Sequence, residues 1–277
     1  MDPIEILIRT SIGIVAGVVG GLAGLGGSII MLPAMAMIWG YRIDGQEDEH
    51  QTRHHVYMAA AMCVNVIVAL SSTLMHAKKG AARKDVLMSL VPSMTAGMVA
   101  GVLMAGESPG RWSILAFAGF IWMYCAYNII TTVKKIPDHP IDAPSPAHWK
   151  MIVIGVFVGG VSGYLGIGGG ILLVPLLQIS GLPLRHAIAG SAGVMWISSI
   201  IGASMKLYTL PSITYPAPND SVHLMISDAM GFAIPMGVGA LIGGYLGAWI
   251  AHKIKLPHLK LVIALILAIA SVKMVMR

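Results

Sequence analysis

The stretch GVVGGLAGLGGSIIMLP, residues 17–33, returns in the second half of the chain as GGVSGYLGIGGGILLVP, residues 159–175. The two copies share their spacing of glycines and of a final proline, at 17, 21, 24, 26, 27 and 33 and at 159, 163, 166, 168, 169 and 175. Glycine lowers the stability of a helix, and proline removes one of its backbone hydrogen bonds. We therefore expect a helix that breaks at the same point in each half.

The composition places these breaks in a membrane. Of 277 residues, 56% are hydrophobic and only 11% are charged, whereas soluble domains carry about 25% charged residues. A membrane-spanning helix needs about 20 apolar residues. Uncharged runs of this kind occur at 54–77, 86–106, 112–133, 186–205 and 229–252, and 256–276 also fits if Lys260 and Lys273 reach the two membrane surfaces. The sequence predicts an all-α polytopic membrane protein.

A polar, proline-rich segment at 134–150 divides the chain into two predicted repeats, 1–133 and 151–277, within one membrane domain. A second match supports this division, because Pro92 and Gly101 have the same spacing as Pro235 and Gly244. The halves differ at 42–55, which we expect to be an extra solvated loop in the first half. It contains four acidic residues and three histidines, and metal binding by these histidines is the weaker interpretation.

The uncharged runs that hold the glycines, 10–41 and 151–184, are too long for one span and short for two. A re-entrant hairpin of two part-length helices, which returns the chain to its starting side, fits both the length and the break. Each repeat would then contain this hairpin plus three transmembrane helices. Because three is odd, the two repeats would be inverted relative to each other.

The basic residues favour the same topology. Inverted repeats place the basic loops 78–84 and 253–260 on one face, which the positive-inside rule assigns to the cytoplasm, with both termini outside. Eight plain spans with parallel repeats divide the lysines and arginines equally well, but they put these two loops on opposite faces. The net charge of +6 is better explained by this cytoplasmic face than by nucleic-acid binding, since no basic stretch with aromatic residues occurs.

The broken helices predict a binding site for an anion. A helix that starts at Ser28 or at Gly170 exposes free backbone N–H groups and the positive end of its dipole. Two such ends, brought together by the repeat, would hold a small oxyanion without a cationic side chain. The alternative is that the glycines only allow close helix packing, which we favour for 17, 21, 159 and 163. We assign the site to Gly24, Gly26, Gly27, Ser28, Gly166, Gly168, Gly169 and Gly170.

The pattern Gly-x-x-Gly-x-Gly-Gly, followed by an apolar run and a proline in each half, resembles the sulfite exporter TauE/SafE family. The resemblance covers nearly the whole chain and includes Ala-Gly-Ser at 189–191. It implies export of sulfite or of organosulfonate anions such as sulfoacetate across the bacterial inner membrane. One departure is Ala-Ala-Ala-Met at 59–62, where members often carry a pair of hydroxyl side chains.

Four polar residues at the predicted spans are further candidates. Asn65, in the middle of its span, makes either an interhelical hydrogen bond or a contact with the substrate. Ser191, which follows the second glycine stretch, either binds substrate or bonds to its own helix. His76 and Lys206 occupy matching places at the ends of spans and are either interfacial anchors or gating residues that attract the anion.

Other classes of function fit less well. An intramembrane serine hydrolase would need Gly-x-Ser-x-Gly, but 189–193 reads Ala-Gly-Ser-Ala-Gly, and no histidine lies nearby in its span. No Lys-Ser or Lys-Thr follows the glycines, so they are not a nucleotide loop. We therefore expect a transporter rather than an enzyme, with no cofactor and no metal. Uptake of a sulfur-containing anion is the alternative to export, and Gly243, Gly244 and Gly247 suggest a helix interface for a possible homodimer.

Overall fold

A computed structural model describes residues 2–24, 26–40, 53–78, 80–81, 83–133, 139–216 and 221–250, together with 268 and 272. The described part is helical apart from one short hairpin. Its elements are α1 (Pro3–Ala23), α2 (Ser28–Trp39), α3 (Arg53–Lys78), α4 (Lys84–Glu107), α5 (Gly110–Val133), α6 (His148–Leu165), α7 (Gly170–Ile179), α8 (Leu184–Thr209), the 3-10 turn η1 (Leu210–Ser212), β1 (Thr214–Pro216), β2 (Ser221–His223) and α9 (Ile226–Ile250). β1 and β2 pair antiparallel.

Seven of the described helices are long and apolar enough to cross a membrane, namely α1, α3, α4, α5, α6, α8 and α9. The polytopic character that the sequence predicts is therefore confirmed, and the bounds of the five internal spans lie within four residues of the expected ones. α2 and α7 are shorter, because each begins only after a glycine break. The predicted last span, 256–276, lies outside the described residues except for two positions.

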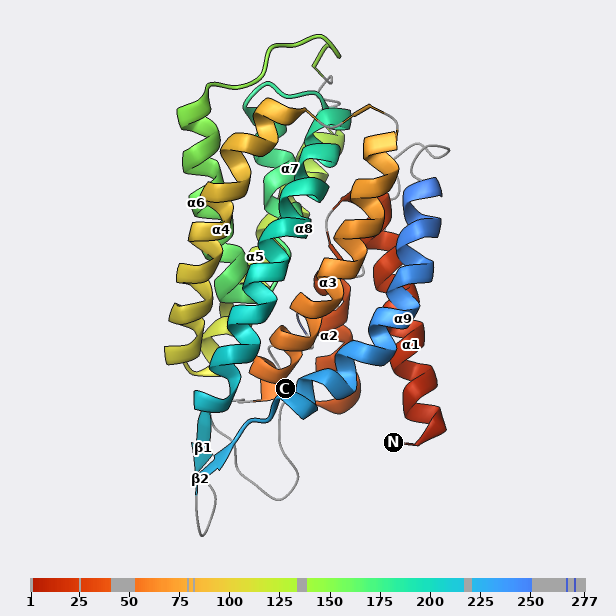
Figure 1. The fold of residues 1–277 in the computed structure, drawn as a ribbon, viewed down its shortest axis with the longest axis vertical. Coiled ribbons are helices and arrows are strands. Elements are labelled where there is room, and N and C mark those ends of the chain that lie inside the picture. The colour runs from red at the N-terminus through yellow and green to blue at the C-terminus, as the bar shows by residue number, and fades with distance from the viewer. Residues whose placement is uncertain are drawn as a thin grey trace.

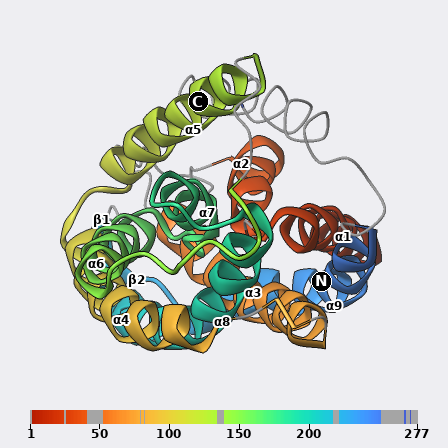
Figure 2. The ribbon, with the colours of Figure 1, turned by 90° about the horizontal axis from the view of Figure 1, so that it is seen from above.

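The chain reverses direction at each break, and it does so from opposite ends of the bundle. In Figure 1, α1 begins at the lower end beside the N-terminus and α2 returns toward that end, whereas α6 begins at the upper end and α7 returns there. The main helix contacts are α1 with α9, α4 with α6, α3 with α8, α3 with α9 and α4 with α8. Exchanging α1 for α6, α3 for α8 and α4 for α9 turns the first two pairs into each other and the last two into each other, and it leaves the α3–α8 pair unchanged. Seen from above, α5 lies at the edge of the bundle (Figure 2).

Glycines bring two of these helix pairs into backbone contact. A Cβ atom on Gly17 would lie 2.8 Å from the carbonyl oxygen of Ala240 on α9, and one on Gly21 would lie 2.5 Å from that of Gly244. Gly159 and Gly163 pack in the same way against the backbone of α4. The predicted packing role of these four glycines is therefore confirmed, since small residues allow helices to approach closely in lipid.

The glycine face proposed for a homodimer is used inside the chain. Gly243 and Gly247 on α9 pack against the backbone of α1, and Gly244 faces Ser71 on α3. These glycines are therefore unavailable for a contact between two copies, so this part of the prediction is wrong. The reason is that the three glycines do not form one face: successive residues of a helix point to different neighbours.

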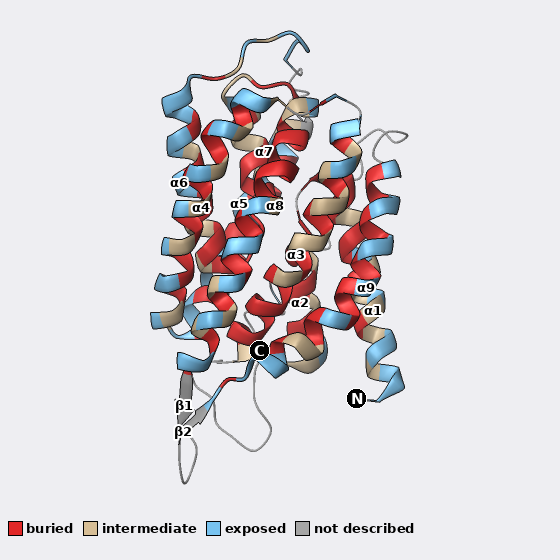
Figure 3. Cartoon of the chain, viewed as in Figure 1, coloured by how far each residue is buried: buried red, intermediate tan, exposed pale blue. Residues whose placement is uncertain are grey.

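The bundle is apolar on its outer surface as well as inside. Buried residues line the centre and exposed residues lie on the outward faces of the helices (Figure 3). Many of the outward residues are large and hydrophobic, including Met88, Trp122, Phe157, Ile234 and Leu241. Such an outer surface suits lipid rather than water. Polar side chains that are buried inside this bundle are therefore unusual and mark candidate functional positions.

Candidate functional site

Both breaks are tight turns that need glycine. In the first, Gly24 and Gly26 have φ values of 64° and 81°; in the second, Gly166 and Gly169 have φ values of 72° and 80°. Only glycine adopts this left-handed conformation without steric cost. The two turns match at Gly24 and Gly166 and differ after that, since Gly27, the counterpart of Gly169, has a φ of −86°. Each turn ends one helix and starts the next.

The two breaks lie against each other in the interior of the bundle. The Ser191 hydroxyl, on α8, donates a hydrogen bond of 3.2 Å to the carbonyl oxygen of Gly24. A Cβ atom on Gly170 would collide with that same oxygen. The sequence prediction that these segments come together is therefore confirmed, and Ser191 bonds to the other half rather than only to its own helix.

Asn65, on α3, connects the breaks. Its Oδ1 accepts hydrogen bonds from the backbone N–H groups of Gly27 at 2.8 Å and of Ser28 at 3.1 Å. Its amide nitrogen Nδ2 is buried and has no hydrogen-bond partner. A Cβ atom on Gly168 would lie 3.1 Å from that nitrogen, so Nδ2 faces the second break. Asn65 thus makes an interhelical hydrogen bond, which is one of its two predicted roles. Its Nδ2 group is an unused donor, so the other role, a contact with the substrate, stays a prediction.

The backbone N–H groups at the start of α2 are therefore not free, although the sequence predicted that they would be. Asn65 caps α2, because its side-chain oxygen satisfies two of the exposed N–H groups. The second start fits the expectation better. α7 has no side-chain cap, and within the described part of the chain the amides of residues 168–171 donate no hydrogen bond. An uncapped helix start inside a protein is rare and needs a partner.

Other unused donors surround these amides. The hydroxyl groups of Ser28 and Ser162 are buried and have no partner, and the Ser162 oxygen would lie 2.9 Å from a Cβ atom on Gly169. The residues that contact the breaks include no carboxylate within the described part of the chain. The electrostatic potential at the breaks is consequently positive, which suits a negatively charged ligand.

Two residues in this region were missed from the sequence: Met195 and Ser162. The Met195 sulfur would lie 3.1 Å from a Cβ atom on Gly26 and 2.5 Å from one on Gly168, so it fills the space between the breaks. A signal was present, because Met195 and Asn65 differ by the same number of positions as Lys206 and His76. Met195 is thus the counterpart of Asn65 in the other half.

Lys206 and His76 lie inside the protein and not at its surface. Lys206 is 0% exposed and His76 is 5% exposed. Lys206 contacts His55 across the α3–α8 interface, with 3.1 Å between Nζ and Nδ1. The interpretation of Lys206 as an interfacial anchor is therefore wrong, because its side chain lies on the side of α8 that packs against α3.

The predicted solvated loop at 42–55 is also wrong at its end. α3 begins at Arg53, and both His54 and His55 are buried in its first turn. The sequence placed these two histidines both in this loop and in the span 54–77, and the structure confirms the span. Residues 41–52 lie outside the described part. The described residues contain no group of three side chains that would hold a metal ion.

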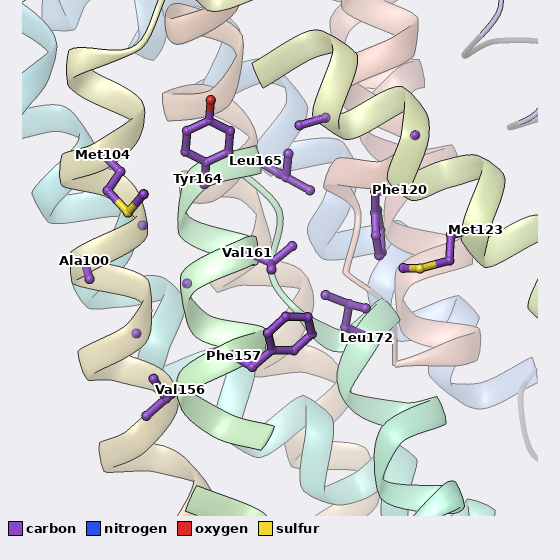
Figure 4. A pocket seen from close by; sticks show the side chains of 15 residues that line it. Ala100, Met104, Phe120, Met123, Val156, Phe157, Val161, Tyr164, Leu165 and Leu172 are labelled. Atoms are coloured by element: carbon purple, nitrogen blue, oxygen red, sulfur yellow. The ribbon is translucent and has the colours of Figure 1, made fainter. Parts of the chain in front are cut away.

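A separate cavity is an apolar groove of about 500 Å³ between α4, α5, α6 and the start of α7 (Figure 4). Leu165 and Leu172, on either side of the second break, belong to its lining. Phe157, Met104 and Met123 line it and are more than half exposed. Because it is apolar and opens on the lipid-facing surface, it offers no donors for an anion. The paired breaks are the stronger candidate.

Comparison with known proteins bears on the kind of function and not on the position of the site. The model of the family described as "Sulfite exporter TauE/SafE" matches residues 10–274. A probable membrane transporter protein of Methanocaldococcus jannaschii is 25% identical over 270 residues, which cover 96% of this chain and 93% of the relative. The probable membrane transporter protein YunE of Bacillus subtilis is 25% identical over 288 residues, covering 97% of each chain. Both names describe a membrane transporter and specify no substrate.

Proposed function

The chain belongs to the sulfite exporter TauE/SafE family, and from this premise we propose that it exports sulfite or a small organosulfonate anion across the bacterial inner membrane. The family and the relatives indicate a membrane transporter rather than an enzyme. The observation that carries the proposed substrate class is the uncapped start of α7 opposite the free amide of Asn65. These donors would bind an oxyanion without a full positive charge.

The anion would lie between the breaks, where Met195 now fills the space. The proposed ligands are the amides of residues 168–171, the Asn65 amide, and the hydroxyls of Ser28, Ser162 and Ser191. A methionine side chain is unbranched and adaptable, so it can withdraw without a change of fold. Gly24, Gly26, Gly27 and Gly166 would shape the turns that aim these donors at the anion.

We further propose that the two halves are inverted repeats and that transport occurs by alternating access. The hairpins α1–α2 and α6–α7 enter from opposite ends of the bundle, and the exchange of helix pairs supports this view. Rocking of one half against the other would expose the central site to each face in turn. His76 and Lys206, at opposite ends of the α3–α8 interface, are the proposed gating residues.

Cysteine labelling will test the proposed orientation. In a variant that lacks Cys63 and Cys125, single cysteines at Lys78 and at Lys255 should react with an impermeant maleimide only from the cytoplasm. A single cysteine at Asp220, between β1 and β2, should react only from the outside. Cells and inverted vesicles distinguish the two faces. Labelling of Lys78 and Lys255 positions from opposite faces would exclude inverted repeats.

Anion selectivity will test the proposed substrate class. Neutral donors and helix dipoles compensate one negative charge better than two, and doubly charged sulfate is strongly hydrated. We expect sulfite near pH 6, where hydrogen sulfite is abundant, to bind at least roughly tenfold more tightly than sulfate, a difference of about 1.4 kcal/mol. Calorimetry and thermal stabilisation of the detergent-purified protein will measure it. Sulfate binding as tight as sulfite binding would contradict a site made of backbone donors.

A further inference from the structure

A buried lysine lies at one end of the α3–α8 interface, and no carboxylate among the described residues pairs with it. Lys206 is 0% exposed, and its ammonium group contacts the imidazole of His55, which is 2% exposed. His54, 0% exposed, lies beside them in the first turn of α3. The pair is at the end of the bundle where α8 finishes and α3 starts, which is the lower end in Figure 1.

The charged surroundings of this cluster are entirely basic within the described part of the chain. The groups that interact electrostatically with Lys206 are His54 and His55 on α3, and α4 contributes the backbone of Ser108 near His55. The one ion pair among the described residues, between Arg9 and Glu5, is elsewhere. A buried ammonium group without a counter-ion is costly, and the negative end of the α8 dipole compensates only part of this cost. A lysine that served packing alone would not need its charge.

Buried residues on α8 connect Lys206 with the paired breaks. It lies on the same helix as Met195, eleven residues further on, which corresponds to about 16 Å along the axis. Between them, Ser198, Ser199 and Gly202 are buried on α8. The Ser199 hydroxyl has no hydrogen-bond partner. A line of small and polar residues therefore connects the breaks with the basic cluster through the interior of the protein.

We propose that Lys206, with His55 and His54, forms a second anion site, which an anion occupies on its way between the breaks and this face of the membrane. It would take the same small, singly charged oxyanion as the central site. This inference rests on the proposed function, since it assumes that the transported ligand is an anion. Lys206 supplies both the full charge and the charge-assisted hydrogen bonds.

Equilibrium dialysis with radioactive sulfite will count the sites. Purified wild-type protein at saturating sulfite near pH 6 should hold about two anions per chain, and Lys206→Met and Gly168→Leu should each hold about one. Lys206→Arg, which keeps the charge, should hold two. Lys150→Met removes an exposed lysine at the opposite end of the bundle and serves as the matched control, which should also hold two. Because Lys206 is buried, its effect should be the same at low and at high ionic strength.

The outcomes separate the two proposals. Two bound anions in Lys206→Met, or one in wild type that only Gly168→Leu removes, would overturn the second site and leave the central one. One anion in wild type that only Lys206→Met removes would support the lysine site and overturn the site at the breaks. Wild type that binds no sulfite would overturn both. Without anion, Lys206→Met should unfold at the wild-type temperature or higher, because it removes an uncompensated buried charge; a lower temperature would indicate a structural lysine instead.

Discussion

Gly168→Leu is expected to abolish transport while the protein still reaches the membrane. A Cβ atom at this position would lie 2.5 Å from the Met195 sulfur and 3.1 Å from Asn65 Nδ2. A leucine side chain would therefore fill the space in which the anion is proposed to bind. We expect the rate of sulfite export from proteoliposomes to fall at least roughly 100-fold, as for a loss of about 2.7 kcal/mol of binding free energy.

Stability should change less than transport. The backbone of Gly168 does not have a positive φ, so leucine introduces no backbone strain there. Its neighbour Met195 is flexible and can shift, and overpacking of a core costs about 1–3 kcal/mol. Gly168→Ala should give an intermediate rate, because a single methyl group displaces only the end of the methionine side chain.

Gly119→Leu is the matched control for this prediction. Gly119 lies in the middle of α5, is exposed, and has no atom within 4 Å of its Cβ position. The same substitution should leave transport at the wild-type rate. If Gly168→Leu and Gly119→Leu transport equally well, the breaks are packing motifs and the substrate binds elsewhere. Gly26→Leu should also abolish transport, but its φ of 81° adds strain, so it is the less specific test.

Most of the architecture could be predicted because it depends on local patterns. Apolar length determines which segments can cross a membrane, and matched glycines and prolines determine where helices break. The close packing of Gly17 and Gly159 also follows from their spacing. Each of these properties depends on the residues of one segment, so it can be recognised from the sequence without knowledge of the neighbouring helices.

The contents of the site were harder to predict because they depend on pairs of distant residues. The cap that Asn65 provides for α2 joins positions 38 apart, and nothing near Gly27 indicates it. His54 belonged both to a predicted span and to a predicted loop, and only the structure shows that it is buried in the first turn of α3. Lys206 looked like an anchor since it lies near a helix end, but its side chain packs against His55 on α3. In each case a contact between helices decides the role.

Asn65→Asp is expected to keep the fold and lose transport, which separates the two roles of this side chain. A carboxylate oxygen can still accept the hydrogen bonds from the Gly27 and Ser28 amides, and a helix start stabilises a negative charge. The second oxygen, however, would replace the Nδ2 donor that faces Gly168. A carboxylate beside the proposed anion is a like-charge contact that costs several kcal/mol, so sulfite export should fall by at least roughly 100-fold.

Asn128→Asp provides the opposite control. Asn128 is buried on α5, at the edge of the bundle, and its Nδ2 donates to the carbonyl oxygen of Tyr124 at 2.8 Å. Aspartate cannot make that bond, so the variant should lose roughly 1–3 kcal/mol of stability and keep transport. Thermal unfolding and proteoliposome export, measured on both variants, give the comparison. An Asn65→Asp protein that is destabilised like Asn128→Asp but still exports sulfite would show that Asn65 only holds the helix start, and that its free amide does not meet the substrate.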